Sequence, residues 1–477
     1  MSGILNVPGL WPVIDVNGDP VSGATINFYE PGTTTPKAVY SDATLATSLG
    51  TQLTTNAGGE PTTLAGAIAR LWWGPTGVSY DIQVTAGAAT RTWSDVFIGQ
   101  GSVSIDLRDF GAKCDGTTAD DAAWAAVFAA NPNGFFTLTW PGFTRITTPI
   151  TPPAGCSNVI VSPNGGAAIM ATGTHAHTLL NLPSTVFNWQ VYGVKFFTGS
   201  ANSVSQNWAI VCAGDSCSFE QIRMTNVHSG LRVTGPKFYG KKIYGSAFKA
   251  VDGIGINIAQ ATTGTEVVEI ENIFLESDPA AKPQYGVLVE QASACYLQGL
   301  ATQFLFGLVV QPGNGQVVAT LDLDFEADNC QGAGITFSAA GTGAVQRVSG
   351  FLRSTSNAGD GVDFVVPPAS SDLQLRVADN GVRGVRLRAV DQKNSRLKIM
   401  AGGNGTHGFE ADSGATRFRA EIMAGPIDDF GTNGQYGAVI GASCDNFTVT
   451  VDGQGGTTGQ IFNGAGTSAT KVVTTRV

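Results

Sequence analysis

One eight-residue pattern recurs in NAGDGVDF (357–364), NGVRGVRL (380–387) and NGTHGFEA (404–411). Each copy has an asparagine and, four residues later, a glycine that precedes an apolar, a variable and an apolar residue. A spacing of about 20–50 residues indicates a repeat architecture. Because Asn and Gly both tolerate left-handed backbone conformations, we interpret each Asn–Gly pair as a corner between short strands. The glycine motif begins at nine positions with a mean spacing of about 26 residues: Gly230, Gly255, Gly286, Gly307, Gly334, Gly361, Gly384, Gly408 and Gly437.

The composition agrees with a stack of short strands. Glycine is 62 of 477 residues, charged residues are 13% and hydrophobic residues are 43%. The chain is too apolar for a disordered protein and too rich in glycine for a helical bundle, and it lacks the glycine period of collagen. Together, the repeat and the composition predict a parallel β-helix. With strands ~4.8 Å apart, residues 102–477 would form about 14 turns and a rod of roughly 70 Å.

The third residue of each glycine motif should point outward, because alternate residues of a strand face opposite sides. Read along the motifs, this column is Arg232, Asn257, Leu288, Val309, Thr336, Asp363, Arg386, Glu410 and Val439. Asp363, Arg386 and Glu410 alternate in charge on consecutive turns. We therefore predict an exposed ladder of ion pairs there, each worth little on its own.

Charge and composition also limit the partners. The formal net charge is −10, so we expect no binding to nucleic acid, whose phosphates repel an acidic protein. No stretch approaches the ~20 apolar residues of a membrane helix, so we expect no membrane insertion. The seven cysteines are scattered, which indicates reduced thiols in a chain made in a cytoplasm. His175 and His177 lack a third ligand, so we expect no metal and no cofactor.

Residues 1–100 predict a small β domain. Residues 24–29, 80–84 and 92–98 are expected strands, and residues 15–20 an expected turn. The stretch VIDVNGDPVSGATINFYEPGTTTPKAVYSDA (13–43) resembles the N-terminal module of phage tail fibres and tailspikes. The shared elements are an Asp-x-Asn-Gly turn, a strand ending in Phe-Tyr-x-Pro-Gly-Thr, and a following Val-Tyr-Ser-Asp. The resemblance implies that residues 1–100 attach the protein to phage tail or baseplate proteins.

The next segment predicts a short helix at the end of the repeats. Thr118 can cap a helix whose first turn carries Asp120 and Asp121, where carboxylates favour the helix dipole. Trp124, Val127 and Phe128 give it one apolar face. We expect this helix to cover the open end of the strand stack, which would otherwise invite aggregation. The alternative for the paired aspartates is an acid/base site.

RDFGAKCDGTTADDAAW (108–124) resembles the opening of the pectate-lyase-like superfamily. The Asp-Phe-Gly-Ala, Asp-Gly and paired-aspartate elements match, while Cys114 stands where glycine is usual. The resemblance implies an all-β fold, a right-handed parallel β-helix, with a small N-terminal β domain and a short capping helix. The expected domains are an anchor at 1–100, a neck and cap at 101–140, and the β-helix at 141–477.

Together the two resemblances imply a phage tailspike or tail-fibre receptor-binding protein. Such a protein is a homotrimer of the virion tail, assembled in the host cytoplasm, and recognises a host surface glycan. Two alternatives stay open: an adhesin or structural tail component that binds without cutting, and a polysaccharide depolymerase acting as a glycoside hydrolase or lyase. A free pectate-lyase-like enzyme is a third alternative, disfavoured by the anchoring module. The fold alone cannot choose among them.

Residues 321–328, LDLDFEAD, contain the candidate catalytic carboxylates Asp322, Asp324 and Glu326. Alternation points them outward while the apolar residues between them face the core. Neighbours on one strand face are ~7 Å apart, which suits the ~6.5–9.5 Å carboxyl separation of an inverting glycoside hydrolase. Glu269 and Glu271 offer a second such pair. The alternative is a solvated acidic strand face.

Two further features bear on a site. The aligned motifs place Arg353 and Arg376 on the turns beside Glu326, which favours a structural ion-pair ladder over an acid, because a nearby cation stabilises carboxylate anions. Trp208 and Tyr239 are candidate substrate-binding residues, since aromatic rings can stack on sugars, with core positions as the alternative.

Overall fold

The computed structural model describes residues 13, 19–41, 47–63, 65–67, 69, 79–97, 103–171, 177–198, 207–248, 250–260, 267–339, 341–366, 368–388, 391–426, 431–453, 456–466 and 471–476. It divides into two compact units, residues 1–104 with 135–137, and residues 105–134 with 138–477. None of its helices in these residues is long and apolar enough to cross a membrane.

The first unit contains an antiparallel sheet with the strand order β5-β4-β1-β6-β7. Its core includes Ile26, Phe28, Tyr80 and Ile82, which are fully buried. Three of its strands lie where the alternating sequence predicts them, while most of the expected turn at 15–20 lies outside the described residues. The strands are β1 (Thr25–Tyr29), β2 (Val39–Tyr40), β3 (Ser48–Gly50), β4 (Gln52–Thr55), β5 (Pro61–Thr62), β6 (Ser79–Ala86) and β7 (Ala89–Phe97).

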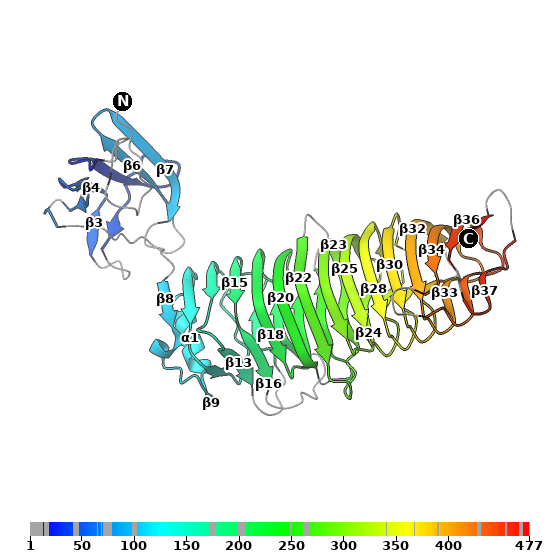
Figure 1. Cartoon of the computed structure of the whole chain (residues 1–477). Coiled ribbons are helices and arrows are strands. Elements are labelled where there is room, and N and C mark those ends of the chain that lie inside the picture. Colours follow the sequence, from blue (N-terminus) through cyan, green and yellow to red (C-terminus); the bar gives the residue numbers. More distant parts are fainter. Residues whose placement is uncertain are drawn as a thin grey trace. The chain divides into compact units, whose positions relative to one another are not determined.

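The second unit is a right-handed parallel β-helix of about 12 turns (Figure 1), which confirms the predicted fold class. One of its faces, the glycine face, is built from the strands that carry the glycine motif and from their neighbours in the same ladder. The glycine face comprises β14 (Leu180–Leu182), β17 (Trp208–Cys212), β19 (Ser229–Val233), β21 (Ile254–Ala259), the start of β23 (Tyr285–Thr302), β24 (Phe306–Val310), β26 (Ile335–Phe337), β29 (Val362–Phe364), β31 (Val385–Leu387), β33 (His407–Ala411), β35 (Tyr436–Ile440) and β37 (Gly459–Asn463).

The other strands of the second unit form the long face. In the first turns this face consists of short strands, and in the later turns most of its strands are longer. The short strands are β8 (Val103–Asp106), β9 (Asp115–Ala119), β10 (Phe136–Thr139), β11 (Phe143–Arg145), β12 (Val159–Val161), β13 (Ala168–Ala171), β15 (Trp189–Tyr192) and β16 (Lys195–Thr198). The later strands are β18 (Cys217–Thr225), β20 (Lys237–Phe248), β22 (Val267–Ser277), the rest of β23, β25 (Val317–Asp328), β27 (Ala344–Val345), β28 (Val348–Thr355), β30 (Asp372–Ala378), β32 (Asp391–Gly402), β34 (Thr416–Ala424), β36 (Asp445–Asp452) and β38 (Lys471–Arg476).

The number of turns is smaller than the 14 that the sequence predicts. The spacing between motifs is right, but the chain before β14 does not build the glycine face. It forms the cap and the short strands of the long face instead.

A bend divides the first part of the long face. Gly193, Gln221, Lys242 and Asn272 lie at this bend and all have positive φ. Residues of β25 have no positive φ, so this strand crosses the face without a corner. The side chains of Asp322, Asp324 and Glu326 therefore share one continuous strand face.

Close backbone packing explains the glycine motif. A Cβ at Gly361 would lie 2.6 Å from the carbonyl oxygen of Gly384, and one at Gly384 would lie 2.4 Å from that of Gly408. These glycines do not have left-handed φ values. They are required because the next turn approaches too closely for any side chain, and not because the chain turns a left-handed corner as we expected.

The asparagines of the motif form a buried ladder. Asn357 donates to the side-chain oxygen of Asn380 at 2.9 Å, Asn380 to Asn404 at 2.9 Å, and Asn404 to Asn433 at 2.8 Å. Each side-chain amide also donates to a backbone carbonyl of the turn before it. Asn226 has the expected left-handed φ of 56°, but these four do not. Their amides satisfy buried polar groups that would otherwise destabilise the stack.

The register of the outward column is confirmed, but its ion pairs differ from the prediction. Asp363 lies beside Arg386, and Arg386 beside Glu410. No residue of the column is exposed. Asn257, Leu288, Val309 and Asp363 are buried, and the other five are half-buried. Arg386 and Arg388 pair diagonally, because their side chains are long enough to reach a residue of the neighbouring turn two positions along. Arg383 instead pairs with Asp360, which the same register places directly beside it. The bonds are Arg388 with Asp363 at 2.7 Å, Arg386 with Asp412 at 3.0 Å, and Arg383 with Asp360 at 3.0 Å and with Glu410.

The predicted capping helix is present as α1 (Asp121–Ala130), preceded by the 3-10 helix η1 (Leu107–Phe110). Thr118 is not its cap, because β9 extends through that residue, and Asp120 takes the N-cap position. Asp120 accepts hydrogen bonds from the backbone of Lys113 at 2.7 Å and of Cys114 at 3.3 Å. This buried carboxylate therefore fixes the chain before the helix.

Asp121 ties α1 to the next turn. Its carboxylate accepts hydrogen bonds from the backbone and hydroxyl groups of Thr147 and Thr148, at 2.7–3.1 Å. Burial acts to raise the pKa of Asp121, but the hydrogen bonds from Thr148 and Thr147 outweigh it and lower the pKa below its usual value. Both aspartates thus have structural roles in the cap.

All seven cysteines are free and buried. Burial raises the pKa of Cys156 and of Cys330 to about 12. Their thiols therefore contribute apolar bulk to the core.

Replacing Asn380 tests the ladder. Asn380→Ala removes four side-chain hydrogen bonds. The buried polar groups on both neighbouring turns that form these bonds then lose a hydrogen-bond partner. We expect the free energy of unfolding to fall by about 3 kcal/mol. The measurement is urea unfolding followed by tryptophan fluorescence. Gln374→Ala, at an exposed position of β30, is the control; equal losses in the two variants would contradict a stabilising ladder.

Asp121 also predicts a dependence on pH. Its folded pKa lies below the unfolded value of about 3.9, so its contribution is present above that pH and is lost as the pH falls through the folded pKa. We expect Asp121→Asn to lower the free energy of unfolding by about 1 kcal/mol at pH 6, and this difference from the parent to shrink as the pH falls below about 3.9. Calorimetry across pH 2–7 measures it. Asp109→Asn, at an exposed position, should show no such convergence.

Candidate functional site

Two of the three predicted carboxylates, Asp324 and Glu326, line a groove on the long face, and Asp322 lies outside it. This groove, here called the acidic groove, has a volume of about 370 Å³. It crosses β20, β22, β23, β25 and β28, and its lining is Tyr244, Asn272, Ile273, Phe274, Gln298, Gly299, Leu300, Asp324, Glu326 and Arg353. The outward direction of the three carboxylates follows from β25, in which Leu321, Leu323 and Phe325 fill the core.

One arginine bridges two of the three carboxylates. Arg353 donates to Glu326 at 3.1 Å through Nε and to Asp324 at 3.4 Å through a terminal nitrogen. Asp322 lies outside this bridge and contacts the hydroxyl of Ser349 at 3.4 Å. The register places Arg353 beside Glu326 and Arg376 beside Arg353, as the aligned motifs predict.

This bridge limits the chemistry of the pair. A glycoside hydrolase needs one carboxyl that carries a proton and one that is ionised. Here both groups accept hydrogen bonds from the same guanidinium, and such charge-assisted bonds are stronger than those between neutral groups. Nearby, burial and then the charge of Glu326 raise the pKa of Asp328. The arrangement is well suited to accepting hydrogen bonds from a ligand.

Two exposed aromatic residues complete the groove, and sequence reasoning missed both. Tyr244 is 37% exposed and Phe274 is 40% exposed. They are register neighbours on adjacent strands, and the same column continues through Leu300 to Glu326. Aligning the strands of the earlier turns with β25 would have placed both rings in register with Glu326 and so identified them.

The two aromatic residues that the sequence singled out lie apart. Trp208 is in β17 of the glycine face, is 8% exposed, and packs with its ring centroid 5.9 Å from the guanidinium of Arg232. Tyr239 is in β20 of the long face, half-buried and next to Glu269 in the register. Tyr239 and Glu271 raise the pKa of Lys241. The structure does not bring Trp208 and Tyr239 together.

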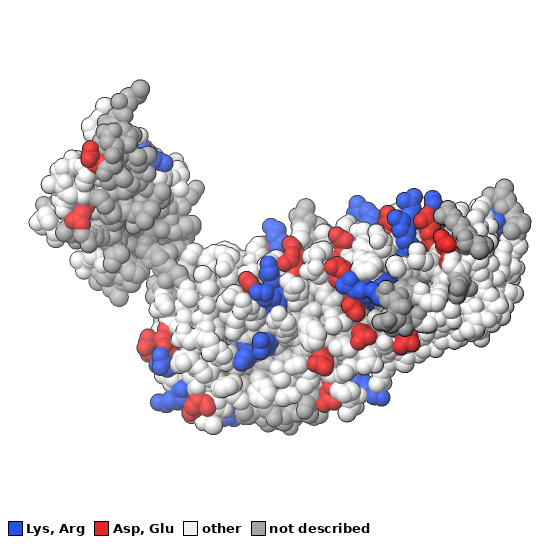
Figure 2. All heavy atoms as spheres, in the orientation of Figure 1, with Lys and Arg blue, Asp and Glu red and all other residues white. Residues whose placement is uncertain are grey.

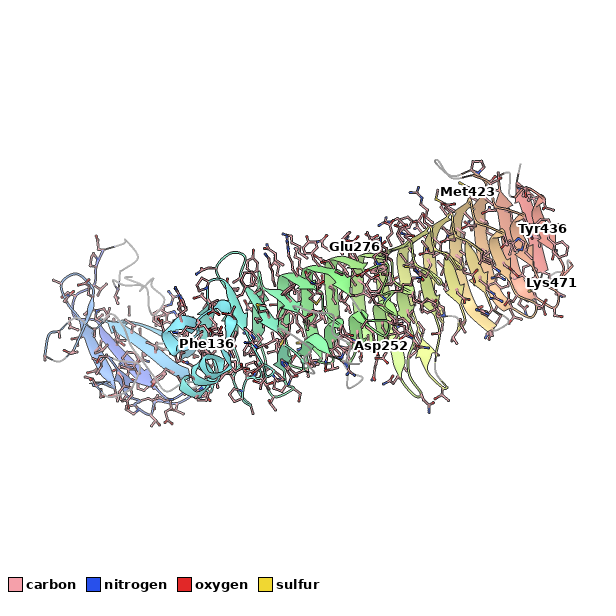
Figure 3. The ribbon with its side chains drawn as sticks, turned by 90° about the horizontal axis from the view of Figure 1, so that it is seen from below. Phe136, Asp252, Glu276, Met423, Tyr436 and Lys471 are labelled. Carbon is pink, nitrogen blue, oxygen red and sulfur yellow. The ribbon has the colours of Figure 1, made fainter. Side chains whose placement is uncertain are left out.

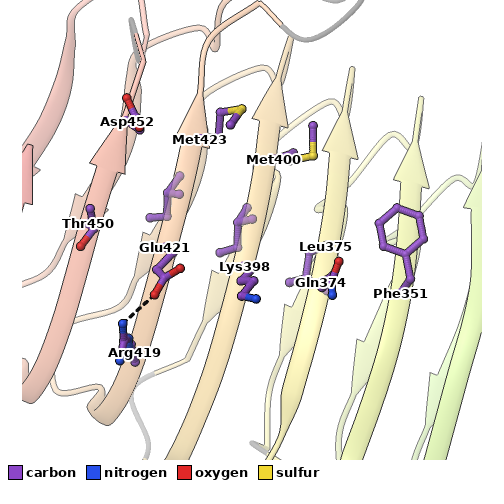
Figure 4. A pocket seen from close by; sticks show the side chains of 12 residues that line it. Phe351, Gln374, Leu375, Lys398, Met400, Arg419, Glu421, Met423, Thr450 and Asp452 are labelled. Carbon is purple, nitrogen blue, oxygen red and sulfur yellow. Dashed lines mark hydrogen bonds and ion pairs between the residues drawn. The ribbon is translucent and has the colours of Figure 1, made fainter. Parts of the chain in front are cut away.

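A second hollow lies further along the long face (Figure 4) and was not predicted. This methionine pocket, of about 400 Å³, crosses β28, β30, β32, β34 and β36. Met400 is 38% exposed and Met423 is 54% exposed. Figure 3 shows Met423 and Glu276 along the same edge of the β-helix, with Asp252 along the opposite edge. The lining is Phe351, Gln374, Leu375, Lys398, Ile399, Met400, Arg419, Glu421, Ile422, Met423, Thr450 and Asp452.

The described residues contain no group of three His, Cys, Asp or Glu side chains that could hold a metal ion. Of the two histidines considered in the sequence, His175 lies outside the described residues.

Comparisons with known proteins identify the fold. No model of a known protein family matches the chain, and no curated protein sequence does. Tailspike protein 3 of bacteriophage CBA120 superimposes with a TM-score of 0.51 and 14% identity, over 82% of this chain and 64% of that one. This likeness shows a shared parallel β-helix.

Two other solved structures match with lower scores. The A-module of a mannuronan C-5 epimerase of Azotobacter vinelandii has a TM-score of 0.46 and 14% identity, over 78% of this chain and 99% of that one. The tailspike protein of Escherichia coli bacteriophage HK620, in complex with a pentasaccharide, has a TM-score of 0.49 and 12% identity, over 78% of each chain.

Proposed function

We propose that this protein is a bacteriophage tailspike that binds a polysaccharide of the host cell surface along the long face. Support comes from the β-helix shared with a tailspike of bacteriophage CBA120 and from the resemblance of residues 13–43 to tailspike anchoring modules. The observation that carries the proposal is the acidic groove, in which exposed aromatic rings lie beside carboxylates.

This combination suits a sugar. A pyranose has an apolar face of C–H groups, which packs on aromatic rings such as Tyr244 and Phe274. Its hydroxyl groups are donors, and the carboxylates of Asp324 and Glu326 are strong acceptors. Side chains of consecutive turns are ~4.8 Å apart along the long face, so a linear glycan can contact several turns at once.

The wider assembly follows the same resemblance. Three chains form a homotrimer, and residues 1–100 attach it to tail or baseplate proteins. The protein is assembled in the host cytoplasm and becomes part of the virion tail.

Cleavage of the glycan is a second candidate function. The observation that favours it is the position of Asp324 and Glu326, two residues apart on one strand face of the groove. Residues two apart on a strand are ~7 Å apart along it, which falls in the ~6.5–9.5 Å range of inverting hydrolases. During cleavage one carboxyl would protonate the glycosidic oxygen, and Arg353 would have to move from it. An adhesin needs no such movement.

The binding function predicts a loss on removing the aromatic rings. Purified protein would be tested by biolayer interferometry against surface polysaccharides from a panel of bacterial strains. For the polysaccharide that binds, we expect the double variant Tyr244→Ala/Phe274→Ala to weaken binding about a hundredfold. Burial of each ring contributes about 1.5 kcal/mol to binding, and every ~1.4 kcal/mol changes the affinity tenfold.

Phe187→Ala is the matched control, since Phe187 is 49% exposed and lies outside the groove. Equal affinities of the double variant and the parent would remove the acidic groove from the proposed site. Failure of the parent to bind any polysaccharide of the panel would contradict the proposed function.

Cleavage by the carboxylate pair predicts a large loss of rate. Asp324→Asn and Glu326→Gln should each slow shortening of the bound polysaccharide by at least about 10²-fold, the lower range for general acid–base residues. Size-exclusion chromatography of the glycan measures chain length, and circular dichroism checks folding. Asp372→Asn, exposed on β30, is the control; an active parent with unchanged rates in both variants would exclude this pair.

A further inference from the structure

Charge is unevenly distributed along the long face. The outward charged residues of β22 and β25 are all acidic: Glu269, Glu271, Glu276, Asp322, Asp324, Glu326 and Asp328. The described charged residues of β28, β30, β32 and β34 are mostly basic. The basic ones are Arg353, Arg376, Arg396, Lys398, Arg417 and Arg419, and the acidic ones are Asp372, Asp391 and Glu421. Figure 2 shows Lys and Arg gathered over the part of the β-helix where β30 and β32 lie. An acidic protein thus carries a basic section on one face.

Part of this basic section is already neutralised by nearby carboxylates. Arg353 bridges Asp324 and Glu326. Arg419 pairs with Glu421 at 2.7 Å, and Arg417 pairs with Asp391. These arginines therefore have their charge partners within the protein.

Two cations have no such partner. Arg396 and Lys398 are both exposed on β32, and neither forms an ion pair with a described residue. Asp372 lies next to Arg396 in the register without pairing with it. Both cations point outward from the same strand at alternate positions, ~7 Å apart along it. They are available to an anionic ligand.

The methionine pocket supplies an apolar surface beside them. Met400 follows Lys398 by two residues on the same strand face, and Met423 continues its column on the next turn. Lys398, Met400 and Met423 all line the pocket (Figure 4). A ligand that fits this surface has an apolar side and an anionic group, within a volume of about 400 Å³.

We propose that the methionine pocket binds a sugar unit that carries a carboxylate, such as a uronic acid of an acidic polysaccharide. The apolar side of the ring lies on Met400 and Met423, and the carboxylate pairs with Lys398 of the pocket lining. Arg396 lies outside the lining, two residues before Lys398 on the same strand face, and adds a second positive charge at the pocket's edge. Asp452, on the far side of the pocket, accepts a hydroxyl group. The inference rests on the proposed glycan-binding function and assigns the chemical class of the glycan.

The acidic groove determines where along the long face the charged units of the glycan bind. Its carboxylates repel an anionic sugar, so the charged units lie over β30 to β34 and uncharged parts lie over β22 to β25. The distance from β25 to β32 is three strand spacings, or roughly 14 Å. A chain with alternating charged and neutral sugars would meet both sections.

The test compares acidic polymers with their neutral counterparts. The full chain is titrated with polygalacturonate, hyaluronan and polymannuronate, and with the same polymers after chemical reduction of the carboxyl groups to alcohols. We expect at least one acidic polymer to bind, and its reduced form to bind at least tenfold more weakly. Binding of the acidic form should weaken as salt is raised from 50 to 500 mM, because exposed charges are screened.

Variants locate the effect in the pocket. Lys398→Gln and Arg396→Gln should each weaken binding of the acidic polymer about tenfold and leave binding of the reduced form unchanged. Lys237→Gln, exposed on β20, is the charge-matched control and should bind as the parent does. Met423→Ser should weaken both forms.

The outcomes separate this inference from the proposed function. Equal binding of an acidic polymer and its reduced form, unchanged binding by Lys398→Gln and Arg396→Gln, or binding to none of the three acidic polymers would each overturn the inference. In all three cases the polysaccharide panel still decides the proposed function. Binding to no polysaccharide in either experiment overturns both.

Discussion

Contact between the backbones of successive turns is the constraint on which the β-helix depends. At Gly384 the carbonyl oxygen of Gly408 occupies the space that a Cβ would need. The same contact links Gly361 to Gly384 and Gly408 to Gly437. Since no side chain separates the turns at this corner, each turn must lie directly on the one before it. The asparagine ladder then satisfies the polar groups that this packing buries.

This stacking made much of the fold predictable. Every glycine motif starts a turn at the same point, so counting from the glycine places Asp363 beside Arg386 and Glu326 beside Arg353. Alternation in β25 correctly separates core residues from outward carboxylates, because a strand that crosses one face has a strict period of two. The cap was predictable from the apolar face of one short helix.

Other features depend on interactions that neighbouring positions do not reveal. The ion pairs on the glycine face run diagonally, since an arginine side chain spans more than one strand spacing. The asparagines form a hydrogen-bonded ladder between turns, whereas the sequence suggested only that they adopt a left-handed backbone at a corner. The methionine pocket combines residues of five strands, and its apolar residues look like core residues in the sequence. Trp208 shows the opposite error: the sequence suggested an exposed sugar-binding ring, but the residue is buried.

The buried thiols give the protein a practical property. All seven cysteines lie beneath the surface, and burial holds Cys156 and Cys330 in the protonated form at neutral pH. Maleimide reagents attack exposed thiolates, so the native molecule offers them little to modify. A single cysteine introduced on the outer surface of a turn can therefore carry a fluorophore or spin label without removing the natural ones. Because the turns repeat at a fixed interval, labels placed on successive turns would give a molecular ruler along the β-helix.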